Sequence, residues 1–434
     1  MLRSFIEVAG GRLLVDISPL RESREFRLIW LSQLATTGGR QVVIVAVPYQ
    51  VYLLTHSSLA VGLLGLFQAV PIVIAGLYGG ALADRFDRRR LQLIGKGLVA
   101  VSSLVLAIGA IDLRAPVWFV YLVVALAAAA STVDQSARSA SVPRLVSRRL
   151  LPSAMSLSQA LFQAASIIGP ALAGLILARA GPSWAYALDV ACFVPGALLI
   201  RRLSPQPPLP GHGVVLGWRA PAEALRHVRH NRVLLGIFAA DLVAMVFGMP
   251  TAVFPALALS VFRIGAGGLG LLYAAPAAGA LVASLLSGWV RNVRRQGLAV
   301  FIAIAVWGVA IAGFGLAGKA LWVGLPLLAL AGAADLVSAI FRSTILQLSI
   351  PDHLRGRMSA FQLMVVTTGP RLGDLEAGAV AALVSPVFSV VSGGVACVVG
   401  IALLAVALPE LRRQRAAAED RAPSGPGADR PNPG

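Results

Sequence analysis

Twelve apolar runs, each long enough to cross a lipid bilayer, constrain the fold of this chain more than any other feature. A spanning helix needs about 20 predominantly apolar residues, and helices satisfy their own backbone hydrogen bonds within hydrocarbon. The runs therefore predict an all-α polytopic membrane protein. Proline interrupts the first and seventh runs, which favours kinked helices beside a cavity. The expected spans are 26–54, 59–80, 91–112, 116–138, 153–179, 183–203, 232–260, 266–290, 297–317, 321–347, 357–385 and 387–408.

The composition argues against a soluble globular protein. Of the 434 residues, 57% are hydrophobic and 13% are charged, whereas a soluble domain carries about 25% charged residues. A net charge of +18 in a soluble chain would suggest nucleic acid as a partner. Here the arginines lie in short connections between apolar runs, so the expected partner is the lipid bilayer and no nucleic acid.

The basic residues are concentrated in every second connection. Because basic loops stay on the cytoplasmic side, this alternation predicts a multi-pass protein of the cytoplasmic membrane with both termini in the cytoplasm. The basic connections are 85–90, 144–149, 201–232, 291–295 and 355–357.

The chain divides near its midpoint. Residues 204–231 contain PQPPLPGHG and then the basic segment EALRHVRHNR, which suits a cytoplasmic linker that ends in a surface helix. The linker separates a lead-in and six-helix half (1–203) from a second six-helix half (232–408). The tail, 409–434, is rich in Arg, Ala, Pro and Gly and is expected to be disordered.

A weak internal repeat supports this division. Three positions recur 208 residues later, where Gly62, Gly80 and Asp84 have Gly270, Gly288 and Asn292 as counterparts. The repeat favours a duplicated six-helix unit, as transporter folds often have.

The segment GGALADRFDRRRL, residues 79–91, joins the second and third runs. So many charges do not lie in hydrocarbon, so a tight loop at the cytoplasmic face is predicted. It resembles the major facilitator superfamily signature between the second and third helices, with Asp87 where most members carry glycine. The resemblance implies that the loop latches one conformational state through Asp84 and Arg88; the alternative is a solvated topogenic loop. The matching residues are Gly80, Leu82, Ala83, Asp84, Arg85, Arg88 and Arg89.

The fifth run contains SIIGPALAGLILA. Gly169, Pro170 and Gly174 resemble the antiporter motif of exporting members of the superfamily, although Ala173 and Ala165 replace two of its glycines. The resemblance implies export. The alternative is ordinary close packing of a helix through small residues.

Ionisable residues inside the runs are the candidates for proton coupling or for lining a cavity, because a charge in the membrane is costly. The resemblance implies that the first, fourth, seventh and tenth helices surround a central cavity, where most of these residues fall. Asp241 is the first candidate for coupling, because it has apolar neighbours and lies near a proline break; Asp335 and Glu376 follow. The candidates are Arg40, Asp134, Arg138, Asp241, Asp335, Arg342, Arg371, Asp374 and Glu376, and Asp189 in the sixth run is a further ionisable residue of this kind.

Static structure is the alternative role for these charges. Asp134 with Arg138, and Arg371 with Asp374, have the spacing of ion pairs on one helix face. Arginines near helix ends, here Arg138, Arg342 and Arg371, can also extend to the membrane surface.

Further local matches resemble the branch of the superfamily that contains the enterobactin exporter and the macrolide efflux proteins. They are VAVPYQVYLLTHSSLAVGLLG, MPTAVFPALA, GLLYAAPAAGALVASLLSG and STILQLSIPDHLRGRMSA. The resemblance implies a secondary active transporter, functional as a monomer. It would export a small organic molecule, a siderophore or an amphipathic drug, by proton antiport and alternating access. A proton-coupled importer and a non-transporting receptor or scaffold are the alternatives.

The sequence contains no motif for ATP binding, nucleophilic catalysis or metal binding. There is no glycine-rich phosphate loop followed by Lys-Ser/Thr, so the proton gradient rather than ATP is the expected energy source, with no cofactor. No nucleophile motif or catalytic cluster is visible, which argues against an enzyme. The five histidines lie in or beside connections without metal-ligand spacing, so no metal site is expected.

Overall fold

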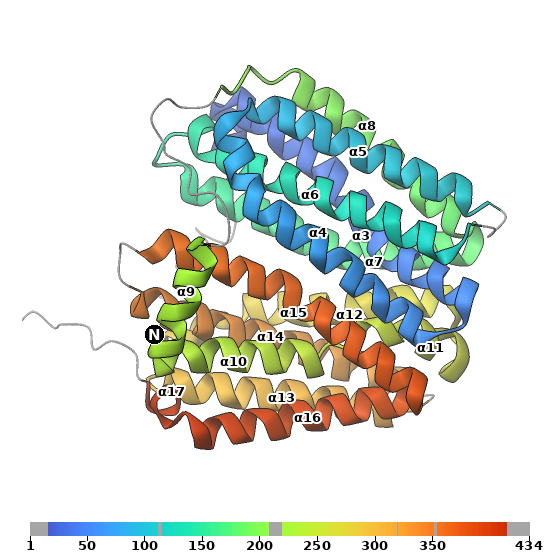
Figure 1. Ribbon diagram of the computed structural model, residues 1–434, viewed down its shortest axis with the longest axis vertical. Helices are drawn as coiled ribbons and strands as arrows, with labels where there is room; N and C mark the ends of the chain where they lie inside the picture. The colour runs from blue at the N-terminus through green and yellow to red at the C-terminus, as the bar shows by residue number, and fades with distance from the viewer. Residues whose placement is uncertain (1–15, 112–114, 208–218, 319, 351–353, 415–434) are drawn as a thin grey trace, which may run out of the picture.

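Long helices make up nearly all of the computed structural model, which describes residues 16–111, 115–207, 219–318, 320–350 and 354–414. No strand occurs within these ranges. The helices form two groups that lie one above the other in Figure 1. The predicted all-α class is confirmed.

The first group contains six long helices, preceded by the short α2 (Ser18–Glu22). Each helix begins and ends within seven residues of its predicted span, because the apolar runs determine where a helix can cross lipid. The six are α3 (Arg24–Thr55), α4 (Ser58–Arg85), α5 (Arg88–Gly109), α6 (Val117–Leu145), α7 (Leu151–Arg179) and α8 (Pro182–Arg201).

The second group begins with a broken helix. The chain leaves α10 (Arg232–Phe247) at Gly248 and resumes at Thr251, where Pro250 supplies no N–H. The predicted interruption is thus present here, whereas Pro48 lies inside a continuous α3. The remaining elements are η1 (Thr251–Val253), α11 (Phe254–Ala256), η2 (Leu257–Val261), α12 (Gly265–Leu285), η3 (Ser287–Asn292), α13 (Gln296–Leu316), α14 (Leu321–Ser349), α15 (Arg355–Leu383) and α16 (Pro386–Ala407).

The outer surface of both groups is apolar, as lipid contact requires. Large side chains such as Trp118, Trp322 and Leu383 are 66%, 80% and 84% exposed, which is unusual on a water-facing surface. Among the described residues, ten helical segments are long and apolar enough to cross a membrane. The helices α3 and α15 are about as long as these ten segments, but they carry more polar side chains and are not counted among them.

We call the end of the bundle that carries α2 the proximal end, and the opposite end the distal end. In Figure 1 the two groups converge at the distal end, near α11, and diverge toward the proximal end, near α9. The convergence depends on small residues: a Cβ atom at Gly62 would lie 2.5 Å from the carbonyl oxygen of Asp374, and one at Gly174 would lie 2.9 Å from the Cα of Gly270. Glycine therefore lets α4 meet α15 and α7 meet α12.

The connection between α4 and α5 is shorter than predicted. The α4 helix continues through Asp84 and Arg85, so only Phe86 and Asp87 lie outside helices. Asp87 explains the abrupt restart, because its side chain accepts hydrogen bonds from the backbone N–H groups of Arg89 and Arg90 as an N-cap. The predicted loop over 79–91 is therefore mostly helix.

Two segments outside the spans are also helical. The predicted surface helix of the linker is present as α9 (Arg219–His230), while residues 208–218 lie outside the described part. The tail begins with α17 (Pro409–Arg413), whose Leu411 is fully buried against Gly236 of α10. The prediction of disorder is therefore wrong for 409–413, because a single apolar side chain fills a gap between helix ends; residues 415–434 lie outside the described part.

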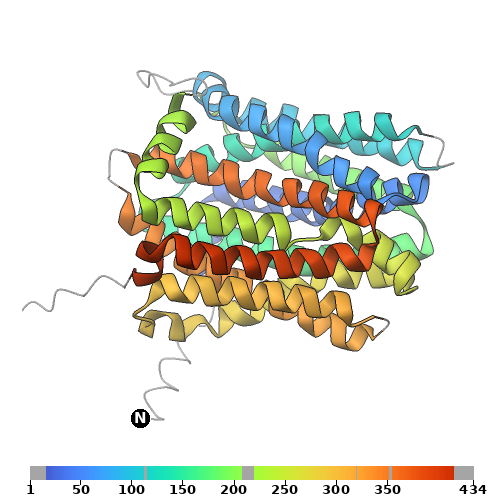
Figure 2. The same ribbon diagram turned by 60° about the horizontal axis from the view of Figure 1, so that its bottom comes forward.

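Figure 2 shows α10, α13, α15 and α16 of the second group side by side. The large apolar core of the bundle lies between such neighbours and includes Trp307, Phe314 and Leu328. Several charged side chains are buried within this packing, and the candidate site is built from them.

Candidate functional site

One guanidinium group stands between two carboxylates in the second group. Arg342 of α14 approaches Asp241 of α10 with Nη1 and Oδ1 2.5 Å apart, and its Nη2 lies 3.5 Å from Oδ1 of Asp335. The Arg342 and Asp241 side chains are each 8% exposed, whereas Asp335 is 40% exposed. The cluster carries one more acid than base, so it can hold a proton without an unpaired cation.

The helices explain why these three residues meet. Asp335 and Arg342 are seven residues apart on α14, which is two helical turns and therefore one face. Asp241 faces them from α10, about two turns before the break at Gly248. Neither Arg342 Nη1 nor Asp241 Oδ1 has another hydrogen-bond partner within the described residues. The predicted extension of Arg342 to the membrane surface is wrong, since this buried acid attracts it inward.

A cavity of about 170 Å³ adjoins this cluster. Its walls come from α10, α14 and α15 and include Phe238, Met245, Ser343 and Gln362 besides the charged residues. The cavity is large enough for a few water molecules and too small for a drug-sized ligand. This geometry suits proton entry better than substrate binding.

The first group contains a different buried ion pair. Lys96 Nζ of α5 lies 2.9 Å from Asp134 Oδ2 of α6, with the two side chains 1% and 15% exposed. Gly95 allows the approach, because a Cβ there would lie 3.0 Å from the Asp134 side chain. The predicted pair of Asp134 with Arg138 is therefore wrong. The facing lysine is buried with Asp134, while Arg138 donates to the exposed side chain of Gln135.

Lys96 is not among the site residues predicted from the sequence. The sequence does contain a signal for a buried charge at this position, because Lys96 is one of two lysines in the chain and lies inside an apolar run.

Asp374 caps the break in the seventh span. Its Oδ1 accepts hydrogen bonds from the Thr251 hydroxyl and, at 3.0 Å, from the Ala252 backbone N–H. Both groups belong to the first turn of η1, where backbone N–H groups have no acceptor within the helix. The Asp374 carboxylate supplies that acceptor. The predicted pair with Arg371 is consequently wrong: Arg371 donates to the Thr367 carbonyl oxygen of its own helix at 2.8 Å. Arg371 also lies mid-helix rather than at a membrane surface.

The other two candidates are less constrained. Arg40 of α3 and Glu376 of α15 are half-buried. Within the described ranges neither makes a hydrogen bond or an ion pair.

The candidate latch is anchored by Arg88. This buried side chain donates to the carbonyl oxygens of Ala83 and Ala140, at 3.1 and 2.8 Å, and its Nη2 lies 3.5 Å from Asp84 Oδ1. The Asp84 side chain remains 43% exposed. Arg88 therefore fixes α4 to α6, and Asp84 stays accessible at the proximal end.

The remaining latch residues lie around this anchor. Arg85 ends α4 and is exposed, and Arg89 donates to the Arg201 carbonyl oxygen at the end of α8. Gly80 lies within α4, and its surroundings lie outside the described part.

The antiporter-like residues are packing points of α7. Gly169 lies against Gln41 of α3, while Gly174 and the Pro170 carbonyl oxygen lie against Gly270 of α12. Helix α7 is continuous through Pro170. The three residues thus hold the fifth span against the first within its own group, and against the eighth across the boundary between the two groups.

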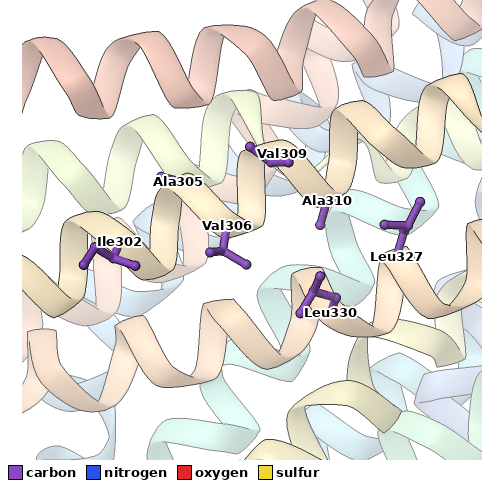
Figure 3. Close-up of a pocket in the computed structure, with 7 residues that line it drawn as sticks. All are labelled: Ile302, Ala305, Val306, Val309, Ala310, Leu327 and Leu330. Carbon is purple, nitrogen blue, oxygen red and sulfur yellow. The ribbon is translucent and has the colours of Figure 1, made fainter.

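A larger groove of about 310 Å³ lies elsewhere, between α13 and α14 (Figure 3). Only aliphatic side chains line it, and Ile302 and Val309 are 56% and 62% exposed. The groove belongs to the lipid-facing surface and offers no group for binding a polar substrate.

Comparisons with known proteins connect this arrangement to transporters. A family model described as transmembrane secretion effector matches residues 15–428. The enterobactin exporter of Salmonella typhi is 30% identical over 408 residues, covering 93% of this chain and 96% of the relative. The enterobactin exporter of Shigella flexneri is 29% identical over 409 residues, with the same coverage of each chain.

Solved structures support the fold. A POT family transporter in complex with 5-aminolevulinic acid matches with a TM-score of 0.72 and 12% identity, over 90% of this chain and 97% of the other. A bacterial homologue of the iron transporter ferroportin in an inward-facing state matches with a TM-score of 0.67 and 18% identity, over 90% and 99%.

Proposed function

Because the chain belongs to the transmembrane secretion effector family of the major facilitator superfamily, we propose that it exports a siderophore across the cytoplasmic membrane by proton antiport. The observation that carries this proposal is the similarity to enterobactin exporters, which extends through both helix groups. An amphipathic drug is the alternative cargo. The termini would lie in the cytoplasm, following the positive-inside rule, and the monomer would be the working unit.

Proton coupling is assigned to Asp241, Asp335 and Arg342. Arg342 is shared by two carboxylates at 2.5 and 3.5 Å. When Asp241 takes up a proton, its attraction for Arg342 weakens, and Arg342 can remain paired through Asp335. An unpaired buried charge is costly. The Asp241 carboxylate is therefore either protonated or paired with the Arg342 guanidinium, and it alternates between these two states. Since Asp241 lies just before the break in the seventh span, this exchange can bias the angle between α10 and η1.

The way the groups meet supports transport by alternating access. They converge at the distal end and diverge at the proximal end (Figure 1). In an exporter with cytoplasmic termini, this is the state that admits cargo from the cytoplasm. Asp84 is exposed in this state. We assign its latch role to the opposite state, in which the proximal ends approach each other.

Transport into inverted membrane vesicles tests the proposal. With an acidic vesicle interior, proton antiport should drive uptake of enterobactin, and a protonophore should abolish it. A macrolide in parallel samples separates the two kinds of cargo, and vesicles lacking the protein provide the background. Uptake of neither compound above that background would reject the proposal, and uptake that is insensitive to the protonophore would reject its antiport step.

A further inference from the structure

Arg40 and Arg371 lie at the same depth in the two helix groups. Arg40 follows the first residue of α3 by 16 positions, and Arg371 follows the first residue of α15 by 16 positions. At a rise of 1.5 Å per residue, each lies about 24 Å from the proximal end of its helix. Two guanidinium groups therefore occupy the middle of the bundle, one from each group.

Neither arginine forms an ion pair with a residue that the structure describes. Arg40 makes no ion pair or hydrogen bond with a described residue, and Arg371 donates only to the Thr367 carbonyl oxygen of its own helix. The Nε of Arg371 is buried without a partner. By contrast, Lys96 and Arg342, which also lie inside spans, are both ion-paired.

The carboxylates that attract the two arginines make their hydrogen bonds to other groups. Oδ2 of Asp189 in α8 accepts a hydrogen bond from the Ser103 hydroxyl at 2.5 Å, while its Oδ1 has no hydrogen-bond partner among the described residues. Asp374 caps η1 through Thr251 and Ala252. Each acid attracts its arginine without contacting it. Arg40 and Arg371 also repel each other electrostatically.

Two cations that repel each other and have no ion-pair partner among the described residues are costly in a low-dielectric environment unless an anion joins them. We propose that Arg40 and Arg371 form a binding site for the acidic group of an organic anion, a carboxylate or a catecholate. Guanidinium groups bind such oxygens through charge-assisted and often bidentate hydrogen bonds.

The site has a consequence for transport. A bound anion would connect α3 of the first group with α15 of the second, relieving the repulsion between the two arginines. The inference deepens the proposed function, on which it rests, by naming the chemical class of the cargo. It also separates this site from the Asp241 cluster, where Arg342 is ion-paired with Asp241 and Asp335.

Equilibrium binding to the purified protein in nanodiscs tests the inference. The probes are radiolabelled 2,3-dihydroxybenzoate and its neutral amide, 2,3-dihydroxybenzamide, which share one ring and differ in charge. The variants are Arg40→Gln, Arg371→Gln and the charge-preserving Arg40→Lys. Arg179→Gln serves as the control, because Arg179 is an exposed arginine at the distal end of α7. Monodisperse elution of every variant confirms folding.

The wild type should bind the benzoate more tightly than the amide. Each Gln variant should bind the benzoate at least about tenfold more weakly, which corresponds to about 1.4 kcal/mol, with little change for the amide. Arg40→Lys should retain part of the affinity, and Arg179→Gln all of it.

Equal binding of the two probes by the wild type would overturn the inference. Benzoate binding that is unaffected in both Gln variants, or no benzoate binding at all, would do so as well. Because this assay measures binding without a gradient, its result is independent of whether the vesicle experiment shows siderophore export.

Discussion

The hydroxyl groups of Tyr52 and Ser260 are hydrogen-bonded at 2.7 Å across the boundary between the two helix groups. The two residues are 208 positions apart, which is the interval that relates Gly62 to Gly270 in the sequence repeat. Equivalent residues of two repeats meet each other where a pseudo-twofold axis passes between them. The distal contact between α3 and η2 therefore lies at such an axis.

The same symmetry relates two close helix crossings between the groups. Gly62 of α4 lies against Asp374 and Gly378 of α15, and Gly270 of α12 lies against Pro170 and Gly174 of α7. Both crossings bring backbones together without side chains between them. We infer that they form the distal seal, and that opening this end requires both crossings to separate.

Gly270→Ala should weaken the distal seal. A Cβ at this position would lie 2.8 Å from the Cα of Gly174 and would also meet the Pro170 carbonyl oxygen, so backbone must shift. We expect vesicle uptake to fall about tenfold and cysteine labels at the distal ends of α7 and α12 to react faster. Gly267→Ala is the matched control, since its Cβ would meet no atom within 4 Å. Equal activity of the two variants would contradict the seal.

Asp241→Asn should uncouple transport from the pH gradient. The amide cannot exchange a proton, whereas Arg342 keeps a partner in Asp335, so the fold should survive. We expect gradient-driven uptake to fall to background while substrate exchange without a gradient persists. Asp335→Asn, which changes the more exposed acid at the longer distance, should reduce uptake less. Normal gradient-driven uptake by Asp241→Asn would exclude this residue from coupling.

Lys96→Met should destabilise the first group. The change leaves Asp134 without its cation at a site where both side chains are largely buried, and loss of one partner of a buried pair costs about 3–5 kcal/mol. Thermal denaturation followed by size-exclusion chromatography should show a melting temperature lower by several degrees. Adding Asp134→Asn removes the uncompensated charge and should recover most of the loss. Equal melting of wild type and Lys96→Met would show that the pair contributes no net stability.

Asp84→Ala should slow transport without weakening binding. Asp84 is exposed at the proximal end in the present state, where its ion-pair partner is Arg88 at 3.5 Å. Its proposed latch contact forms only in the opposite state, so we expect the uptake rate to fall about tenfold and the affinity to change less than twofold. Glu22→Ala removes another exposed proximal carboxylate, which is paired with Arg149 at 3.6 Å, and should leave the rate unchanged. A normal rate for Asp84→Ala would reduce the segment to a topogenic role.

Hydropathy and short motifs determined the class of the protein. The apolar runs located the helices because hydrocarbon thickness imposes a minimum length on each span. The motif at 80–89 pointed to the superfamily, and the resemblance to the enterobactin exporter branch is confirmed by relatives matched over 93% of the chain. The proline break in the seventh span was visible for the same local reason, since proline cannot continue the hydrogen-bond pattern.

Only the tertiary structure decided which charges are partners. Helical spacing paired Asp134 with Arg138 and Arg371 with Asp374, yet the actual partners are Lys96 for Asp134 and the start of η1 for Asp374. Spacing along one helix describes that helix alone, whereas a buried charge takes the best partner from any helix that faces it. The unpaired state of Arg40 and Arg371 became visible for the same reason, once the facing helices were in place.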